Sequence, residues 1–441
     1  MSQRLNQIGP GFCLAKFYNL TLHLNSGHNH SCIHPRTHQV PLSEVQHNVH
    51  ALHNSDYKKS VRAEMFAGQR PAECGYCWKM EDADPTVISD RIGFSFNLLD
   101  THPELLDEVK SNGANYDYKP RQLEVSFSSL CNFKCVYCSP EFSSRWFEDV
   151  AKGDAPNIGV WQEHNLKNLE SRNRIPIKNN NPYVDAFWQW FPQVYDQLSW
   201  LKLTGGEPLL HDDTFRLLDW IKSQKNVKLK VGINSNLGVP EKVISKFITA
   251  LNDISDQVKS ITVWVSGEAS GSQFDYIRLG GNHSEWIANL HRVLGQVPAA
   301  QVNIMTTYSA LSVPGYQTFL NDMGVFLQQY PKRFSIDTHT YLQYPKYLQV
   351  DILTPDFVPY IQQQIQTLET YYQQQLIPEY QIGFARRVLM LLEHSLNNPA
   401  PDINNKRSMF CQYIKEFDRR NNLDFKTTFP EMVEFYEKFS N

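Results

Sequence analysis

Three cysteines within eight residues constrain this chain more than any other feature of its sequence. Cys131, Cys135 and Cys138 lie in the run CNFKCVYC, a C-x3-C-x2-C spacing that can bring three thiolates from one loop to a single metal centre. Thiolate ligands favour iron–sulfur clusters or zinc over hard cations. Three protein ligands leave one position of a four-metal cluster open, as in catalytic metal sites. A zinc site that borrows a distant His is the alternative, but no His follows the trio before His164.

Four further cysteines lie in the N-terminal segment and form a second set. Cys13 and Cys32 flank Gly27 in a C-x13-G-x4-C pattern, and Cys74 and Cys77 follow as a CxxC pair. Four thiolates can fill every ligand position of a cluster, so this centre would carry an electron or hold the fold together. A structural zinc ion with four cysteine ligands fits the same spacings.

Composition and charge argue against several classes of protein. The chain has 42 Lys and Arg against 46 Asp and Glu, a net charge of −4, so it lacks the basic excess of a general nucleic-acid binder. No apolar run reaches the ~20 residues of a membrane-spanning helix, and the N-terminus does not resemble a secretory signal. We therefore expect a cytoplasmic protein without membrane contact, whose reduced cysteines bind metal instead of forming disulfides.

The sequence predicts three regions: residues 1–118, 119–350 and 351–441. The first is irregular and rich in His, which we interpret as surface polarity, with one helix expected over 42–68. The third is helical. Residues 169–183 have the Asn and Pro content of a loop inserted after the first strand of the middle region.

The middle region alternates strands with helices, which is typical of parallel β/α units. The predicted strands cover 122–129, 198–210, 228–236, 260–270, 301–310 and 334–343. The predicted helices between them cover 213–224, 240–253, 284–296 and 316–330. Right-handed crossovers would curl the strands into an open or closed barrel. The predicted fold class is α/β: a partial (β/α)6 barrel with an irregular α+β N-terminal domain and a helical C-terminal extension.

Every candidate reactive feature follows a predicted strand at its C-terminal end, the catalytic face of a β/α barrel. The cysteine trio follows the first strand. The other features are Gly205-Gly206-Glu207, Asn234-Ser235-Asn236 and Ser266-Gly267-Glu268, at the ends of the next three strands. Tight strand-to-helix turns would also explain the glycines.

With these features in this order, residues 120–345 resemble the radical S-adenosylmethionine (radical SAM) superfamily, including the aromatic Tyr137 before the last cysteine of the trio. The resemblance implies that the trio holds a [4Fe–4S] cluster whose open iron binds SAM. It implies that Gly205, Gly206 and Glu207 contact the SAM amino group. The family usually has Asp where this chain has Glu268, which puts the ribose contact of that residue in doubt. The remaining implied SAM-binding residues are Tyr137, Ser235, Asn236, Ser266 and Arg278.

The N-terminal set resembles the twitch domain, a shortened SPASM domain that binds an auxiliary [4Fe–4S] cluster. The run VRAEMFAGQRPAECGYCWKME at 61–81 supports this resemblance. In the best-known members this domain follows the barrel, whereas here it precedes it. That order is similar to a group of twitch-domain radical SAM proteins, some of them encoded by phages.

By this resemblance the chain is expected to be an oxidoreductase that cleaves SAM to a 5′-deoxyadenosyl radical. The radical would abstract hydrogen from a peptide or small metabolite, and the auxiliary cluster would accept the second electron. Flavodoxin or ferredoxin would supply the first electron. The helices at 354–376 and 380–396 and the insertion at 169–183 are expected to shape the substrate pocket.

Three alternatives of different classes stay open at this stage. The first is a non-catalytic iron–sulfur scaffold or electron carrier, which the intact trio and GGE disfavour. The second is a redox-neutral epimerase, which needs a hydrogen donor; Cys411 is the spare thiol, although burial in a helix is the simpler interpretation. The third is an enzyme that modifies nucleotides or nucleic acid, which the acidic charge disfavours.

Overall fold

The computed structural model describes residues 2–84, 86–153, 156–163, 165–177, 179–337 and 340–440. The chain has a mixed α/β fold, as the sequence predicts. It divides into two compact units. The first comprises residues 1–128, 175–205 and 225–231, and the second comprises 129–174, 206–224 and 232–441. The sequence boundary expected at 118/119 therefore lies inside the first unit.

The strands form a nine-stranded sheet in the order β3-β2-β1-β4-β5-β6-β7-β8-β9. All six predicted strands are present. They are β4 (Gln122–Ser126), β5 (Trp200–Thr204), β6 (Asn226–Ser235), β7 (Val258–Ser266), β8 (Ala300–Met305) and β9 (Phe334–Asp337). The pairs β4–β5, β7–β8 and β8–β9 are parallel, which is the arrangement that β/α alternation predicts. The end of the strand predicted at 334–343 includes residues 338 and 339, which lie outside the described residues.

Three strands of the N-terminal segment extend the sheet and were not predicted. They are β1 (Asn19–His23), β2 (His28–His30) and β3 (His38–Gln39). β1 pairs in parallel with β4, and β2 pairs with β1 in an antiparallel hairpin. Short strands in a segment rich in His, Asn and Ser carry little of the apolar alternation that reveals a strand. Cys32, a member of the N-terminal cysteine set, follows β2.

The rest of the first unit is helical. Its helices are α1 (Ser2–Asn6), α2 (Ala15–Tyr18), α3 (Leu42–His47), α4 (Ala51–Asn54), α5 (Asp56–Phe66), α6 (Gly75–Ala83), α7 (Asp90–Thr101), α8 (Leu105–Asn112) and α12 (Pro182–Val194). The single helix predicted over 42–68 is wrong, because three helices occupy that range. Ser55 separates the last two: its backbone is extended and its side chain accepts a hydrogen bond from Lys58 N at the start of α5.

The helices of the second unit follow the predicted pattern more closely. They are α9 (Ser144–Ala151), α10 (Gly159–Glu163), α11 (Leu166–Ser171), α13 (Asp212–Lys222), α14 (Glu241–Ile254), α15 (Gly271–Ile277), α16 (His283–Gln296), α17 (Ser312–Gln329), α18 (Val358–Gln373), α19 (Tyr380–Asn397), α20 (Ile403–Asn421), α21 (Phe425–Thr428) and α22 (Val433–Phe439). The loop predicted over 169–183 is wrong at both ends, where α11 ends and α12 begins.

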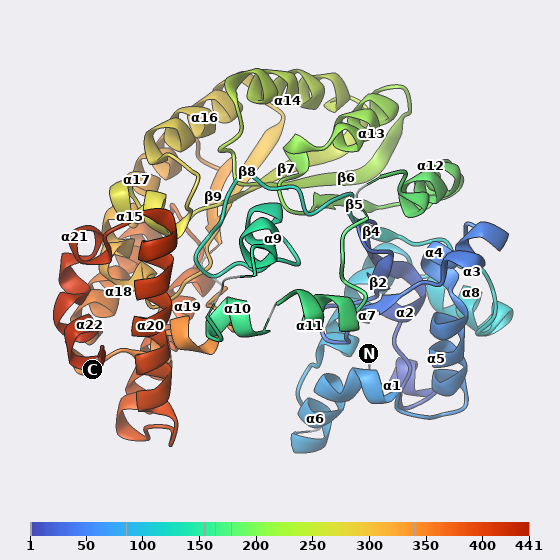
Figure 1. Ribbon diagram of the computed structural model, residues 1–441. Helices are drawn as coiled ribbons and strands as arrows, with labels where there is room; N and C mark the ends of the chain where they lie inside the picture. The colour runs from blue at the N-terminus through green and yellow to red at the C-terminus, as the bar shows by residue number, and fades with distance from the viewer. Residues whose placement is uncertain are drawn as a thin grey trace. The chain divides into compact units, whose positions relative to one another are not determined.

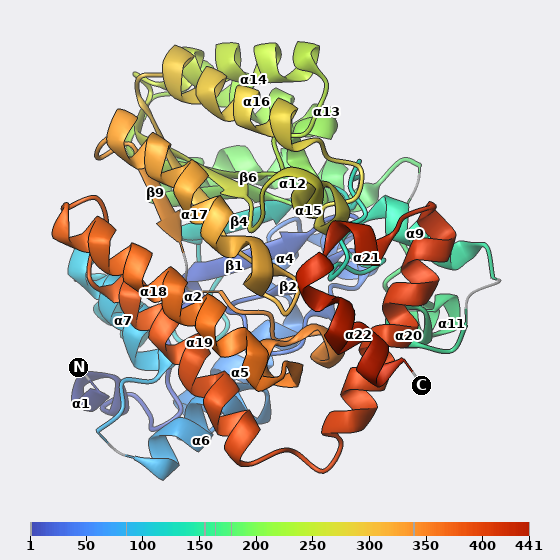
Figure 2. The ribbon, with the colours of Figure 1, turned by 90° about the vertical axis from the view of Figure 1, so that its left-hand side faces the viewer.

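Buried and partly exposed side chains alternate along β7 and β8, and the buried ones form part of the core of the second unit. Val263, Val265 and Ile304 are buried, while their neighbours on the opposite face are partly exposed. Figure 1 shows α16 and α17 along the outer side of these strands, and Figure 2 shows α17, α18 and α19 side by side. Within the described part of the chain, we find no helix with the length and apolarity needed to span a bilayer.

Candidate metal and cofactor site

The cysteine trio lies on a loop that leads from β4 to α9 and is fixed by its backbone. Lys134 N donates to Leu279 O at 2.7 Å, and Val136 N donates to Ile277 O at 2.8 Å. Ser144, in the first turn of α9, accepts a hydrogen bond from Cys131 N through its hydroxyl at 3.1 Å. The loop is therefore held in place independently of any metal, and all three cysteines remain partly exposed.

Within the trio, neighbouring thiols raise the pKa of Cys131 and of Cys138. Burial raises the pKa of Cys131 to about 12, and the neighbouring Cys135 adds to that increase. Burial raises the pKa of Cys138 further, and the other two cysteines contribute. The pKa of Cys135 is about 11, since burial raises it while the Arg278 guanidinium lowers it. Binding of a metal would displace these protons.

Donors surround two of the sulfur atoms. Cys131 Sγ accepts from Phe133 N at 3.4 Å, and Asn236 Nδ2 lies 4.0 Å from it. Arg278 Nη1 lies 3.9 Å from Cys135 Sγ. Hydrogen bonds of this kind stabilise thiolates and tune iron–sulfur centres. Three clustered thiols with such donors fit the ligand set of an iron–sulfur cluster.

Two glycines, Gly205 and Gly206, follow β5 directly. Gly205 has φ of +146°, in the region that favours glycine. A Cβ at Gly206 would lie 2.4 Å from Leu130 O, a distance that no side chain permits. The next amide, Glu207 N, donates to Leu130 O at 2.7 Å. The GGE motif therefore holds the start of the cysteine loop through a backbone hydrogen bond.

The Glu207 carboxylate points into the protein and accepts three hydrogen bonds. Its donors are Asn236 N at 2.6 Å, Ser235 Oγ at 2.9 Å and Leu209 N at 3.0 Å. Burial nevertheless raises the pKa of Glu207 to about 7. The contact of this carboxylate with SAM, expected from the resemblance, stays a prediction. In the structure the carboxylate orients the turn after β6, and through Asn236 it reaches Asn132 of the loop, at 3.0 Å between the two amides.

Glu268 and Arg278 form a buried ion pair beside the loop. Arg278 Nη2 lies 2.5 Å from Glu268 Oε2, and the Tyr137 hydroxyl donates to Glu268 Oε1 at 2.8 Å. Glu268 is 0% exposed. These three residues were expected to contact SAM separately, and the structure brings them together around Cys135. Ser266 ends β7, partly exposed, on the opposite strand face from the buried Val265.

The four N-terminal cysteines line a single cavity. Cys13 precedes α2, Cys32 follows β2, and Cys74 and Cys77 lie at the start of α6. Burial raises the pKa of Cys13 and of Cys74 to about 12. Segments far apart in the sequence thus bring all four thiols to one enclosed space, which fits a fully ligated centre.

Two cations share this cavity, and each has a carboxylate partner. Lys16 pairs with Glu73, and Arg91 Nη2 lies 2.8 Å from Glu81 Oε2. The Lys16 ammonium counteracts the rise in the pKa of Cys13 that burial causes. Among the described residues, no three His, Cys, Asp or Glu side chains converge on one point at the spacing of a single metal ion.

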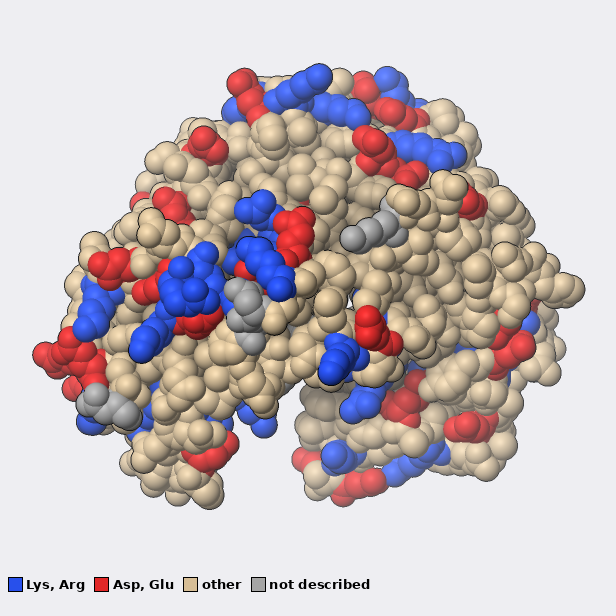
Figure 3. All heavy atoms as spheres, viewed as in Figure 1, with Lys and Arg blue, Asp and Glu red and all other residues tan. Residues whose placement is uncertain are grey.

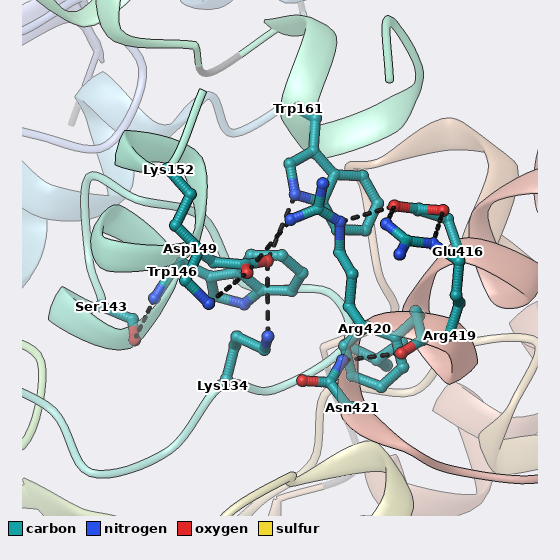
Figure 4. Close-up of polar contacts among 12 residues, drawn as sticks. Lys134, Ser143, Trp146, Asp149, Lys152, Trp161, Glu416, Arg419, Arg420 and Asn421 are labelled. Atoms are coloured by element: carbon teal, nitrogen blue, oxygen red, sulfur yellow. Dashed lines mark hydrogen bonds and ion pairs between the residues drawn. The ribbon is translucent and has the colours of Figure 1, made fainter. Parts of the chain in front are cut away.

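Sequence reasoning missed the contacts that hold the loop from its other side. Trp146 Nε1 donates to Cys135 O at 2.8 Å, and the Tyr413 hydroxyl donates to Val136 O at 2.5 Å. Figure 4 shows the adjoining charged groups, in which Asp149 lies among Lys134, Lys152 and Arg420. Trp146 and Asp149 could have been suspected from their place just after the trio. Tyr413 and Arg420 carry no sequence signal, because packing alone brings them near the loop.

Cys411 lies in α20, outside both cysteine sets. It is 2% exposed, and its thiol lies 3.5 Å from Tyr436 O. Its role as a hydrogen donor, raised as an alternative from the sequence, stays untested. The buried helical position is the one expected for a packing residue.

No protein-family model matches this chain, and no curated protein matches it. Among solved structures, SuiB of Streptococcus suis bound to S-adenosylmethionine is similar at 15% identity and a TM-score of 0.40, covering 74% of this chain and 62% of that chain. SuiB alone is 13% identical with a TM-score of 0.37, covering 81% and 69%. SuiB bound to the precursor peptide SuiA is 15% identical with a TM-score of 0.36, covering 73% and 62%. In two of these comparisons the chain spans less than two thirds of the SuiB chain.

Proposed function

We propose that this chain is a radical SAM enzyme. The observation that carries the proposal is the loop of Cys131, Cys135 and Cys138, which Glu207, Asn236 and Arg278 contact. A [4Fe–4S] cluster bound there would supply one electron to the SAM sulfonium, splitting its C5′–S bond into methionine and a 5′-deoxyadenosyl radical that takes hydrogen from the substrate.

The chain's own residues would prepare this chemistry in three ways. Asn236 and Arg278 place N–H donors beside Cys131 and Cys135, which stabilises their thiolate forms. Glu207 fixes the turn that carries Asn236. Glu268 offsets the charge of Arg278, so that a buried cation can face the thiolates at low cost.

The four cysteines of the first unit are proposed to hold an auxiliary [4Fe–4S] cluster. Their common cavity supports this assignment, and a zinc ion with four thiolates is the competing occupant. An auxiliary cluster would take the second electron from the substrate radical, so the net reaction would be an oxidation. The proposed substrates are a peptide or a small metabolite, the proposed electron donor is flavodoxin or ferredoxin, and the proposed compartment is the cytoplasm.

The test is anaerobic purification and reconstitution, followed by measurement of iron, zinc and 5′-deoxyadenosine with dithionite and SAM. Two [4Fe–4S] clusters predict about eight irons per chain. Cys135→Ala should keep about four irons and lower deoxyadenosine to the background, whereas Cys411→Ala should match the parent. A fully loaded parent that forms no more deoxyadenosine than Cys135→Ala would contradict the proposal and favour the scaffold or electron-carrier alternative. Four irons with one zinc per chain would mean that zinc occupies the N-terminal site. That site could then not accept the second electron.

A further inference from the structure

Helix α20 of the C-terminal extension reaches the cysteine loop through a chain of buried charges. Lys134 lies between Cys131 and Cys135, and its Nζ is 3.4 Å from Asp149 Oδ2. Asp149 Oδ1 is in turn 3.3 Å from Arg420 Nη1 of α20. The side chains of Asp149 and Arg420 are only 5% and 4% exposed. A buried charge is costly unless it is paired, so each of these groups depends on the other two.

Neighbouring groups fix the geometry of this network. Arg420 Nε donates to Glu416 Oε1 at 2.6 Å, and Trp161 Nε1 donates to Asp149 Oδ2 at 3.3 Å. Lys134 Nζ lies 5.1 Å from the centre of the Trp146 ring, whose Nε1 donates to Cys135 O. Figure 4 shows the aromatic rings packed around the charges. The network therefore ends at the backbone of a cysteine ligand.

Burial also strengthens the electrostatic effect of these charges on a centre bound at the nearby cysteine loop. Charges in a low-dielectric interior interact far more strongly than charges in water, whereas exposed charges are screened. Lys152 offers the contrast, since it touches the same carboxylate at 3.6 Å but is 66% exposed. Figure 3 shows Lys and Arg side chains at the surface over α9 and α20, with Asp and Glu side chains among them.

We propose that Lys134, Asp149 and Arg420 act as positioning residues that hold the cysteine loop and set the redox potential of the centre bound by the trio. The inference rests on the proposed function in one respect, because it requires a redox centre at that loop. It adds that a residue of the C-terminal extension, far from the trio in sequence, controls how readily that centre accepts an electron.

A redox titration followed by electron paramagnetic resonance tests the electrostatic part. Asp149→Asn removes a buried negative charge and should shift the midpoint potential of the trio centre upward. Arg420→Gln removes a buried positive charge and should shift it downward. Arg420→Lys should restore the parent potential, and Lys152→Gln should leave it nearly unchanged. Shifts of Asp149→Asn and Arg420→Gln in the same direction, or no shift in either, would overturn the proposal, because general loosening of the loop cannot produce opposite signs.

A second measurement needs neither iron nor activity. In the iron-free protein, alkylation of Cys135 is followed by peptide mass spectrometry. Its rate should rise several-fold in Arg420→Gln and remain at the parent value in Arg420→Lys and Lys152→Gln. Equal rates in all four proteins would overturn the positioning role. If the parent binds no iron at the trio, the proposed function fails, yet this labelling comparison still decides whether α20 holds the loop.

Discussion

The two cysteine sets are built in opposite ways. The trio lies within eight residues of one loop and stays partly exposed, whereas the N-terminal four come from separate segments between residues 13 and 77 and line one cavity. A ligand set on one loop leaves room for a further ligand on the open side. A set contributed by several elements encloses its centre. The difference matches the proposed function, which needs an open centre at the trio and a closed one at the N-terminal four.

Both regions balance a buried cation with a carboxylate, but not equally. Arg278 and Glu268, beside the trio, are 5% and 0% exposed in their side chains. Lys16 and Glu73, beside the four, are 6% and 13% exposed, and Glu73 also accepts from the Tyr57 hydroxyl at 2.9 Å. The ion pair beside the trio is therefore more deeply buried than the pair beside the four. Removing one partner of the deeper pair should cost more free energy of unfolding.

The largest expected effect separates the two sets by their metal content. Cys74→Ala should reduce iron from about eight to about four per chain while deoxyadenosine formation stays within a few-fold of the parent. Cys135→Ala should lose the same amount of iron and all deoxyadenosine. Iron analysis and quantification of deoxyadenosine on both variants check this. Loss of deoxyadenosine in Cys74→Ala would contradict the separation into an open and a closed centre.

The second prediction concerns the ion pair beside the trio. Arg278→Met leaves a fully buried carboxylate without its cation, so we expect a loss of roughly 3–5 kcal/mol in the free energy of unfolding. Adding Glu268→Gln should recover most of that loss. Lys16→Met is the matched change beside the other set, and its loss should be smaller because the Glu73 side chain is 13% exposed, whereas Glu268 is fully buried. Urea unfolding of the iron-free proteins measures all three, and equal losses would contradict the difference between the regions.

The third prediction uses carboxyl groups with opposite pKa shifts. Burial raises the pKa of Glu207 to about 7, so the folded state holds this proton more tightly than the unfolded state. Its stabilising contribution is complete below about pH 4.3 and is lost as pH rises through 7, a change of about 3 kcal/mol. Relative to the parent, Glu207→Gln should therefore become more stable by about that amount between pH 4.5 and 8.

Glu81, in the first unit, is the control for that prediction. Burial alone would raise the pKa of Glu81, but Arg91 and Ser89 lower it overall. Its contribution is present above about pH 4.3 and is lost only as pH falls further. The difference between the parent and Glu81→Gln should therefore stay constant from pH 5 to 8. Urea unfolding of the iron-free proteins measures both. A flat profile for Glu207→Gln would contradict the expected titration.

The sequence could predict which residues follow the strand ends near the cysteine loop. It could not predict which hydrogen bonds and ion pairs these residues form. Alternation of strands and helices located the six strands, and strand ends located GGE and the Ser235-Asn236 pair. The sequence could not reveal that Glu207 faces inward or that Glu268 pairs with Arg278, because side-chain partners depend on tertiary packing. The departure from Asp at position 268 was visible, and the structure shows the longer Glu268 side chain meeting both Arg278 and Tyr137.

Cys411 lies outside both cysteine sets, and its substitution has the smallest expected effect. It is the eighth cysteine, buried in α20 and close to Tyr436 O. Cys411→Ala removes one small buried group, so the free energy of unfolding should fall by about 1 kcal/mol. Iron and deoxyadenosine should not change, because the other seven cysteines are the proposed ligands of both centres. Loss of iron in this variant would mean that the two sets do not account for all of the metal ligands. Unchanged deoxyadenosine with loss of product, once a substrate is found, would instead favour the redox-neutral reaction in which this thiol donates hydrogen.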